Sequence, residues 1–402
     1  MTDVSTSAAA PIRTPPLSRP TVLLLATACG VAVGNVYLPQ PLLTLVAADL
    51  HTDGAGAGLV ATLTQLGYAA GILLLVPLGD LVRPRPLVTT LLVATAICLT
   101  VAATAPNLPL LATAGALIGI LTVVPQILVP LASHLAPPQQ AGRIVGVLVT
   151  GLLGGIFGSR LLGSLVAQAT SWRLAYATAA VLTLLLAVLL RPALPRQRIG
   201  SPHSSTYRRL LASLPGLLRR QRALRQACLI QFCTFAAFSA TWTVLALHLT
   251  GPRFGWSTAA AGSFGLVGLA AGALTPAAGR RIDRHGPFPV IGAAILTATT
   301  GIAILAFAGT TVTGLVLGTL ALTAGMQAAQ IANQARIFAD RPDARSRVNT
   351  IYMTAAFVGG SLGSAAGTTA YHHHGWAGLC IANAALLVVA AAGHLHAVAA
   401  RR

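Results

Sequence analysis

The sequence contains no lysine and no glutamate, and charged residues make up only 8% of its 402 residues. Soluble domains carry about 25% charged residues, so this scarcity excludes an ordinary soluble protein. All 26 basic residues are arginine and all seven acidic residues are aspartate, which leaves a net charge of +19. That charge does not indicate a nucleic-acid partner, because the arginines lie between long apolar runs, as membrane topology requires.

Residues that usually carry covalent chemistry or bind metals are also few and scattered. The cysteines lie inside apolar runs without metal-ligand spacing, at positions 29, 98, 228, 233 and 380. Three consecutive histidines, at 372–374, have no partner cluster in the sequence. No nucleotide-binding loop or nucleophile set is recognisable. We therefore predict that the protein is not an enzyme and has no catalytic residues, no metal and no cofactor.

Apolar runs dominate what remains, since 55% of the residues are hydrophobic. A helix needs about 20 apolar residues to cross a bilayer. Twelve runs of about this length are present, at 21–44, 55–78, 86–104, 108–132, 143–168, 173–190, 226–250, 257–279, 287–308, 311–335, 348–370 and 375–397. The predicted fold class is an all-α membrane protein with twelve transmembrane helices.

The arginines predict the orientation of these helices. With the N-terminus inside the cell, 23 arginines fall on the cytoplasmic side and only Arg173 and Arg253 fall outside. This follows the positive-inside rule, so both termini are predicted to be cytoplasmic. The Ala, Leu, Arg and Gly bias indicates a GC-rich bacterial genome, hence a multi-pass protein of the bacterial inner membrane.

The long segment 191–225 divides the spans six and six, and the two halves repeat. A Gly-Gly-x-x-Gly-Ser element occurs at 154–159 and 359–364, Trp172 matches Trp376, and Asp80 matches Asp283. Parallel six-span repeats are typical of transporters that rock two bundles around a central site. The predicted parts are a cytoplasmic tail at 1–20, six-helix bundles at 21–190 and 226–397, a cytoplasmic linker at 191–225 and a tail at 398–402.

Four stretches resemble the major facilitator superfamily, in particular its bacterial drug and small-solute exporters. They are NVYLPQPLL (35–43), TLTQLGYAAGILLLVPLGD (62–80), GRRIDRHG (279–286) and the long stretch at 333–360. The resemblance implies two pseudo-symmetric six-helix bundles and secondary active export of a small organic solute or drug by alternating access. The sequence departs from the family pattern at two places. Close relatives would carry an aspartate near Thr323, and the fourth span lacks the arginine that many proton-driven relatives carry.

The resemblance also implies roles for two groups of residues. Asp80 and Asp283 follow the second span of their halves, and they are expected to gate the cytoplasmic side together with Gly79, Arg85, Gly279, Arg284 and Gly286. A second group shares one face of the fifth span and is expected to pack that span against the other bundle, namely Gly151, Gly154, Gly155 and Gly158.

Arg160 is the one charge inside an apolar run, and it lies roughly opposite this glycine face. Full exposure of a central charge to lipid is costly. Arg160 therefore either contacts substrate or ties the fifth span to its own bundle. The candidate substrate-binding residues are the polar and aromatic groups at depth, namely Asn35, Tyr37, Gln40, Gln65, Tyr68, Gln126, Arg160, Trp242, Asn333, Asn349 and Tyr352.

No aspartate lies in the middle of a span, which favours a neutral or anionic small-molecule substrate. Carboxylate-based proton coupling lacks its usual carrier, and His134 and His248 are the nearest alternatives if protons take part. We expect a monomer in the lipid bilayer. An inward sugar or nutrient permease remains the alternative within transport, and a transport-like receptor or channel is the alternative from another class.

Overall fold

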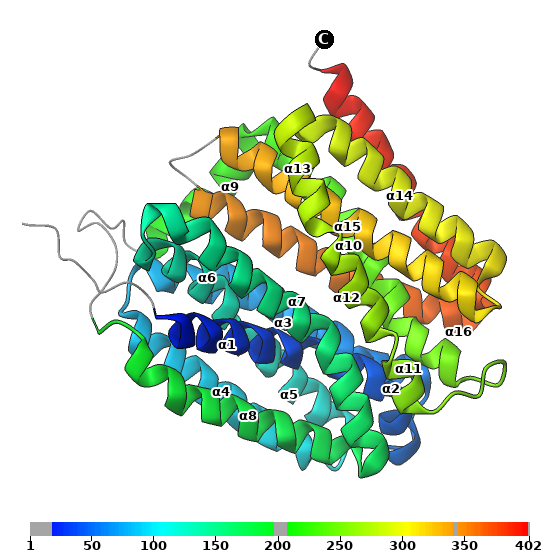
Figure 1. Ribbon diagram of the computed structural model, residues 1–402. Coiled ribbons are helices and arrows are strands. Elements are labelled where there is room, and N and C mark those ends of the chain that lie inside the picture. The colour runs from blue at the N-terminus through cyan, green and yellow to red at the C-terminus, as the bar shows by residue number, and fades with distance from the viewer. Residues whose placement is uncertain (1–17, 197–206, 341–344, 401–402) are drawn as a thin grey trace, which may run out of the picture.

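The computed structural model describes residues 18–196, 207–340 and 345–400 and consists of helices joined by short turns. The tail up to residue 17, positions 197–206 of the linker and residues 401–402 lie outside the described residues. The first half forms six spans (Figure 1), made of α1 (Arg19–Tyr37) with α2 (Pro39–Asp49), α3 (Gly54–Leu75) with the 3-10 turn η1 (Val76–Asp80), α4 (Pro84–Ala103), α5 (Leu108–Leu121) with α6 (Val124–Leu135), α7 (Pro138–Ala169) and α8 (Trp172–Ala193).

The second half also forms six spans. They are α10 (Arg222–Thr250), the broken helix α11 (Thr258–Gly262), α12 (Gly265–Ala273) and α13 (Thr275–His285), then α14 (Pro287–Ala308), α15 (Val312–Asp340) and the two parts of α16 (Arg345–Ala399). Gly375, with φ 61° and ψ −155°, divides α16 into two spans. Only glycine adopts this conformation readily, so the sharp turn between the last two spans depends on it. The predicted twelve-helix fold class is confirmed.

Proline explains three of the helix breaks. A proline lacks the backbone N–H that continues a helix and clashes with the preceding turn. Pro39 begins α2, Pro125 stands at the start of α6, and Pro276 stands at the start of α13. Each break lets one span change direction inside its bundle.

The segment 191–225 differs from the expected linker. It contains a further helix, α9 (Tyr207–Arg220), and α10 begins already at Arg222. The serine, proline and arginine content of this segment led us to predict a loop. Its leucines nevertheless recur on one face of a helix and its arginines on the other.

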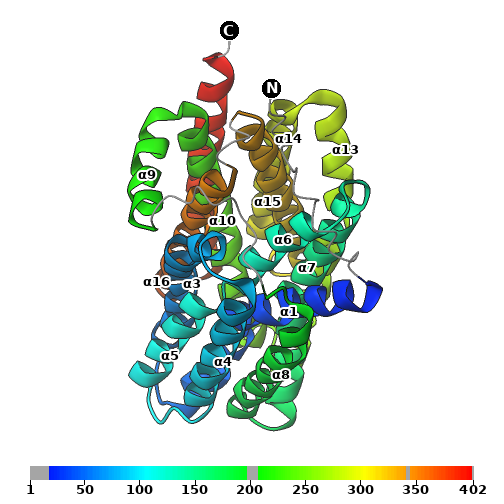
Figure 2. The same ribbon diagram turned by 90° about the vertical axis from the view of Figure 1, so that its left-hand side faces the viewer.

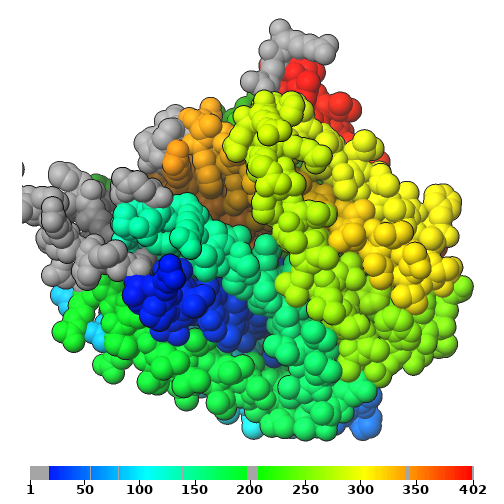
Figure 3. All heavy atoms as spheres, viewed as in Figure 1, coloured from blue at the N-terminus to red at the C-terminus, as the bar shows by residue number. Residues whose placement is uncertain are grey.

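The two bundles meet at one end and separate at the other. Away from the chain termini, α7 packs against α11 and α12, α2 packs against α10, and α3 packs along α16. At the end that carries the termini, α6 and α13 make their main contacts within their own bundles. Figures 1 and 2 show this divergence, and Figure 3 shows the recess that it leaves between α7 and α15.

The glycine face of α7 corrects one prediction. A Cβ at Gly151 would overlap Ala26, and a Cβ at Gly155 would overlap the carbonyl group of Gly30, so both glycines pack against α1 of the same bundle. At Gly154 and Gly158, no described heavy atom lies within 4 Å of the position that a Cβ would take. The expected packing of this face against the other bundle is therefore wrong, because the close approach that glycine permits is used for α1.

Glycines at the actual contact between the bundles come from the partner helices. An added Cβ at Gly262 would overlap Ser164, and an added Cβ at Gly268 would overlap the ring of Phe157. The face of α7 that meets the second bundle is thus the one that carries Phe157, Arg160 and Ser164. The sequence placed Arg160 opposite the glycines, and the structure agrees with that relation.

Candidate functional site

Arg160 lies in a cage of aromatic rings between the bundles. Its guanidinium carbon is 4.7 Å from the ring centre of Tyr37 on α1, 5.4 Å from that of Phe157 and 4.5 Å from that of Trp242 on α10. The residue is only 3% exposed. A desolvated cation over aromatic faces gains about 2 kcal/mol per good contact, which helps to offset the cost of burying the charge.

Hydrogen bonds connect this cage across the bundles. Arg160 Nη2 donates to Gln40 Oε1 at 2.6 Å, and Arg160 Nη1 donates to the carbonyl oxygen of Ile156. Gln40 Nε2 in turn donates to Thr243 Oγ1 of α10 at 3.4 Å. Arg160 therefore contacts its own bundle through Tyr37 and Gln40, and the second bundle directly through Trp242.

One donor of the guanidinium group lacks a partner. Arg160 Nε is buried and makes no hydrogen bond within the described structure. The pocket beside it, lined by Gln40, Arg160, Trp242 and Gly262, has a volume of only about 20 Å³. That is the space of about one water molecule, so an organic solute cannot occupy it while the bundles are closed here.

Three further contacts close the same end of the molecule. Ser361 Oγ donates to the carbonyl oxygen of Thr62 at 2.9 Å, and Ser239 Oγ donates to Gln65 Oε1 at 2.8 Å. At the rim, His372 Nε2 lies 3.9 Å from Asp53 Oδ2. Gln65 is thus a contact between the bundles, in addition to being a candidate for binding.

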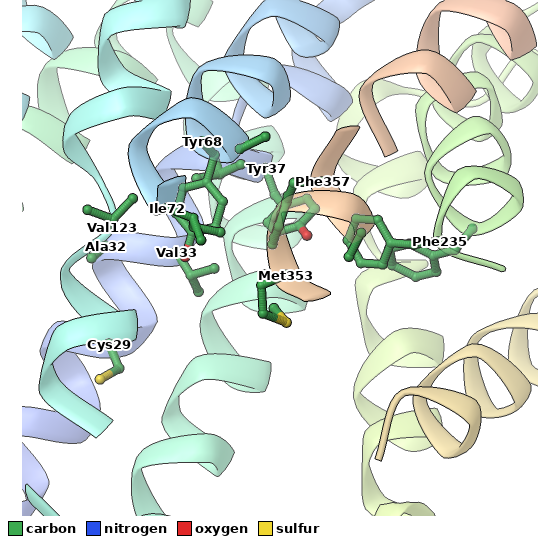
Figure 4. Packing of buried hydrophobic residues seen from close by; sticks show 14 of the residues in the cluster. Cys29, Ala32, Val33, Tyr37, Tyr68, Ile72, Val123, Phe235, Met353 and Phe357 are labelled. Carbon is green, nitrogen blue, oxygen red and sulfur yellow. The ribbon is translucent and has the colours of Figure 1, made fainter. Parts of the chain in front are cut away.

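An aromatic layer separates this closed end from the recess. The rings of Tyr68 and Phe357 meet edge-on with centres 4.4 Å apart, and Phe235 lies 5.0 Å from Phe357. Figure 4 shows Tyr37, Tyr68, Met353, Phe357 and Phe235 gathered between the two bundles. Gln126 Nε2 donates to Tyr68 Oη at 3.4 Å, which orients the tyrosine from α6.

Amide side chains of the second bundle form another polar group. Tyr352 Oη donates to Gln231 Oε1 at 2.7 Å, and Gln231 Nε2 donates to Gln330 Oε1 at 3.4 Å. Gln334 Nε2 donates to Asn349 Oδ1 at 3.2 Å. Gln330, Gln334 and Asn349 are half-buried, so their amides retain capacity for further hydrogen bonds. We call Gln231, Gln330, Gln334, Asn349 and Tyr352 the amide cluster.

Two predicted residues lie outside these groups. Asn35 Nδ2 donates to Thr183 Oγ1 of α8 at 3.1 Å, and Asn333 Nδ2 donates to the carbonyl oxygen of Ala329. Both are buried within their own bundles. Sequence reasoning missed Gln330 and Gln334, although their spacing of four residues places them on one helix face. It also missed Phe357 and Met353, which no polar signal marks.

The expected gating residues lie at the separated end. Asp283 and Arg284 are exposed on α13, and no ion pair of Asp283 occurs among the described residues. Gly286 ends α13 with φ 76°, and Gly279 has open space around it. Arg85 lies in the first turn of α4, Gly79 faces Ile127, and the side chain of Asp80 is outside the described part of the structure.

Comparison with known proteins gives a consistent family. The family model described as Major Facilitator Superfamily matches residues 24–335 and 227–401. The chain is 38% identical to the transporter YgaY of Escherichia coli O157:H7 over 93% of this chain and 94% of that protein. It is 39% identical to the transporter SCO4007 of Streptomyces coelicolor over 91% of this chain and 85% of that protein.

A solved structure shares the fold at lower identity. The bacterial homologue of the human lysosomal transporter Spinster, in an inward-facing and occupied conformation, superposes with a TM-score of 0.75 at 15% identity. The match covers 96% of this chain and 97% of that chain. At this identity the likeness concerns the arrangement of the helices.

Proposed function

The chain belongs to the Major Facilitator Superfamily and is a multi-pass membrane transporter, and from that premise we propose that it exports a neutral or anionic organic solute by alternating access. The observation that carries this proposal is the site itself. Aromatic rings gather between the bundles, the amide cluster lies on the second bundle, and the one buried charge among the described residues is the cation Arg160. Such a lining suits a solute with a flat apolar body and hydrogen-bonding or anionic groups.

With the termini placed in the cytoplasm, the present conformation is the state in which an exporter would take up its solute. The excess of arginines at the end that carries the termini favours that placement. The membrane in this proposal is the bacterial inner membrane. The recess then opens to the cytoplasm, and the Arg160 cage lies on the outer side. A solute would enter from the cytoplasm, contact the amide cluster, and reach Arg160 only after the outer contacts part.

The binding of the solute at Arg160 depends on competition, because Gln40, Trp242 and the solute all interact with the same guanidinium group. In the closed outer end, Arg160 donates to Gln40 and lies over Trp242. An anionic group near the unpaired Nε would form a charge-assisted hydrogen bond, which is stronger than the neutral bond to an amide. Once the outer contacts have parted, the bound solute would thereby compete with Gln40 and Trp242 for Arg160 and delay their return to the closed arrangement. An anion would also leave the cell down the membrane potential, which supplies about 2.3 kcal/mol per charge per 100 mV, so proton coupling is not required.

We expect a deletion strain to be more sensitive to aromatic carboxylates than the parent strain, and an overexpressing strain to be less sensitive, with cationic dyes unaffected. In inverted vesicles, the protein should accumulate the same carboxylates in response to an imposed potential. If the deletion strain became more sensitive to cationic dyes instead, the proposed substrate charge would be contradicted. If intact cells took up a sugar through the protein, the proposed direction of transport would be contradicted.

Asp283→Asn should lower the transport rate by about tenfold while substrate binding is retained. We propose that Asp283 forms an ion pair with an arginine when the cytoplasmic side closes, because the exposed Asp283 has no ion-pair partner among the described residues in the present state. An interaction made in one conformer alone shifts the balance between conformers. Vesicle uptake and binding are measured together, and Asp340→Asn, an exposed aspartate at the end of α15, is the control. Loss of binding in Asp283→Asn would contradict a gating role.

A further inference from the structure

The linker helix α9 has one basic face and one apolar face. Leu211, Leu214, Leu217 and Leu218 pack into the main core cluster, with Leu214 only 6% exposed. The opposite face carries Arg208, Arg209, Arg219 and Arg220, all exposed. Within the described parts of the chain, none of these four side chains forms an ion pair. The helix therefore displays four positive charges that form no ion pair with the described residues.

The helix is attached to both bundles. Tyr207 Oη donates to the carbonyl oxygen of Leu74 on α3 at 2.8 Å. Arg347 Nη1 on α16 donates to Ser213 Oγ at 3.5 Å, and Arg225 on α10 donates to the backbone carbonyl group of Arg219. The apolar face is thus occupied by protein, which leaves the basic face as the one that is free to bind something else.

The surroundings of α9 indicate lipid on both sides. Leu74 and Leu229, on the spans that flank the helix, are each 43% exposed, as expected of side chains that face acyl chains. Figure 2 shows α9 on the outside of α10, at the end of the molecule that carries the termini. A helix in this place lies beside the headgroups of the cytoplasmic leaflet. The inner surface is where anionic lipids attract clusters of arginine.

We infer that the basic face of α9 binds the phosphate groups of anionic phospholipids in the cytoplasmic leaflet. Guanidinium groups bind phosphate oxygens in a bidentate manner, and the four arginines form two pairs about three helical turns apart. A bound headgroup would hold α9 on the membrane surface, and through Tyr207 and Ser213 it would contact both bundles. A soluble polyanion or an acidic protein would fit the charge but not the lipid-facing position.

The test uses full-length protein in nanodiscs, with a fluorophore on Ala212→Cys, an exposed position of α9. Cys98→Ala is included because the other four cysteines are buried. Spin-labelled phosphatidylglycerol and spin-labelled phosphatidylcholine are then compared as quenchers. We expect half-maximal quenching at about tenfold lower phosphatidylglycerol than phosphatidylcholine, since each arginine near an anionic surface contributes substantially. High salt should remove the difference, because screening weakens exposed charges.

The variant Arg219→Gln/Arg220→Gln should lose most of this preference, and Arg208→Gln/Arg209→Gln should behave alike. Arg191→Gln/Arg196→Gln removes the same charge at the end of α8 and just after it, and this variant should keep the preference for phosphatidylglycerol. Quenching by phosphatidylcholine reports whether α9 is still in place in each variant. The inference is overturned if both lipids quench the parent protein equally. It is also overturned if both α9 variants keep the preference for phosphatidylglycerol with unchanged phosphatidylcholine quenching. Displacement of the lipid by glycerol phosphate in solution would overturn it as well.

Discussion

Arg160→Ala should open the outer end of the transporter and shift the ratio of outward-open to inward-open protein by about thirtyfold. The cation–π contact with Trp242 joins the two bundles in the present state, we expect it to be lost when the outer end opens, and such a desolvated contact contributes about 2 kcal/mol. The substitution also leaves Gln40 Oε1 without its donor. Spin labels at His51→Cys and Arg253→Cys, exposed positions of the two bundles at the outer end, measure the change as a longer distance.

Arg173→Ala is the matched control for this experiment. Arg173 lies over Trp172 with 4.3 Å between the guanidinium carbon and the ring centre, and it pairs with Asp49. All three residues belong to the first bundle, so removing the Arg173 side chain should leave the distance between the bundles unchanged. Arg160→Lys should be intermediate, because a lysine keeps the charge but not the planar group. An unchanged distance in Arg160→Ala would show that the cage does not hold the outer end closed.

Gly155→Ala should be among the most damaging single-methyl changes in the protein, with a loss of about 3 kcal/mol in stability. The added Cβ overlaps the backbone of Gly30, and backbone on a packed helix cannot move aside as a side chain can. Overpacking of a close contact costs about 1–3 kcal/mol, and this position lies at the upper end of that range. Thermal unfolding of the purified protein in detergent measures the loss.

Gly154→Ala and Gly158→Ala provide the control on the same helix. No heavy atom of the described residues lies within 4 Å of a Cβ at either position, and alanine favours a helix over glycine by about 1 kcal/mol. Both variants should therefore be as stable as the parent or slightly more stable. If Gly154→Ala were as damaging as Gly155→Ala, the glycine face would have to be packed on a second partner, as the sequence alone had suggested.

The polar residues of the first span show how well the sequence predicts site residues. Tyr37 and Gln40 were selected as candidates because a polar group inside an apolar run needs a reason, and both contact Arg160. Asn35 met the same criterion, yet it bonds to Thr183 within the bundle. The criterion detects burial of a polar group, which is common to a site and to a structural hydrogen bond, so it cannot separate the two.

The linker and the amide cluster show the opposite failure. The helix α9 is short and contains Pro215, so composition favoured a loop, whereas its leucines form a helix because the core is there to receive them. Gln330 and Gln334 belong to a span with several polar residues, and only the approach of α10 and α16 makes these two a group with Gln231 and Asn349. Both the helix α9 and the amide cluster thus depend on contacts with segments that are distant in the sequence.

By itself the sequence determined the number of membrane-crossing helices, their expected orientation and the division into two halves, because these depend on the transfer of whole apolar runs into lipid and on the side where arginines remain. Only the tertiary structure decided which face of each helix meets which neighbour. Gly155 and Arg160 are five residues apart on one helix, yet Gly155 packs on α1 of its own bundle, whereas Arg160 also contacts Trp242 on α10 of the other bundle. That choice depends on the close fit of side chains from distant segments, which no single run encodes.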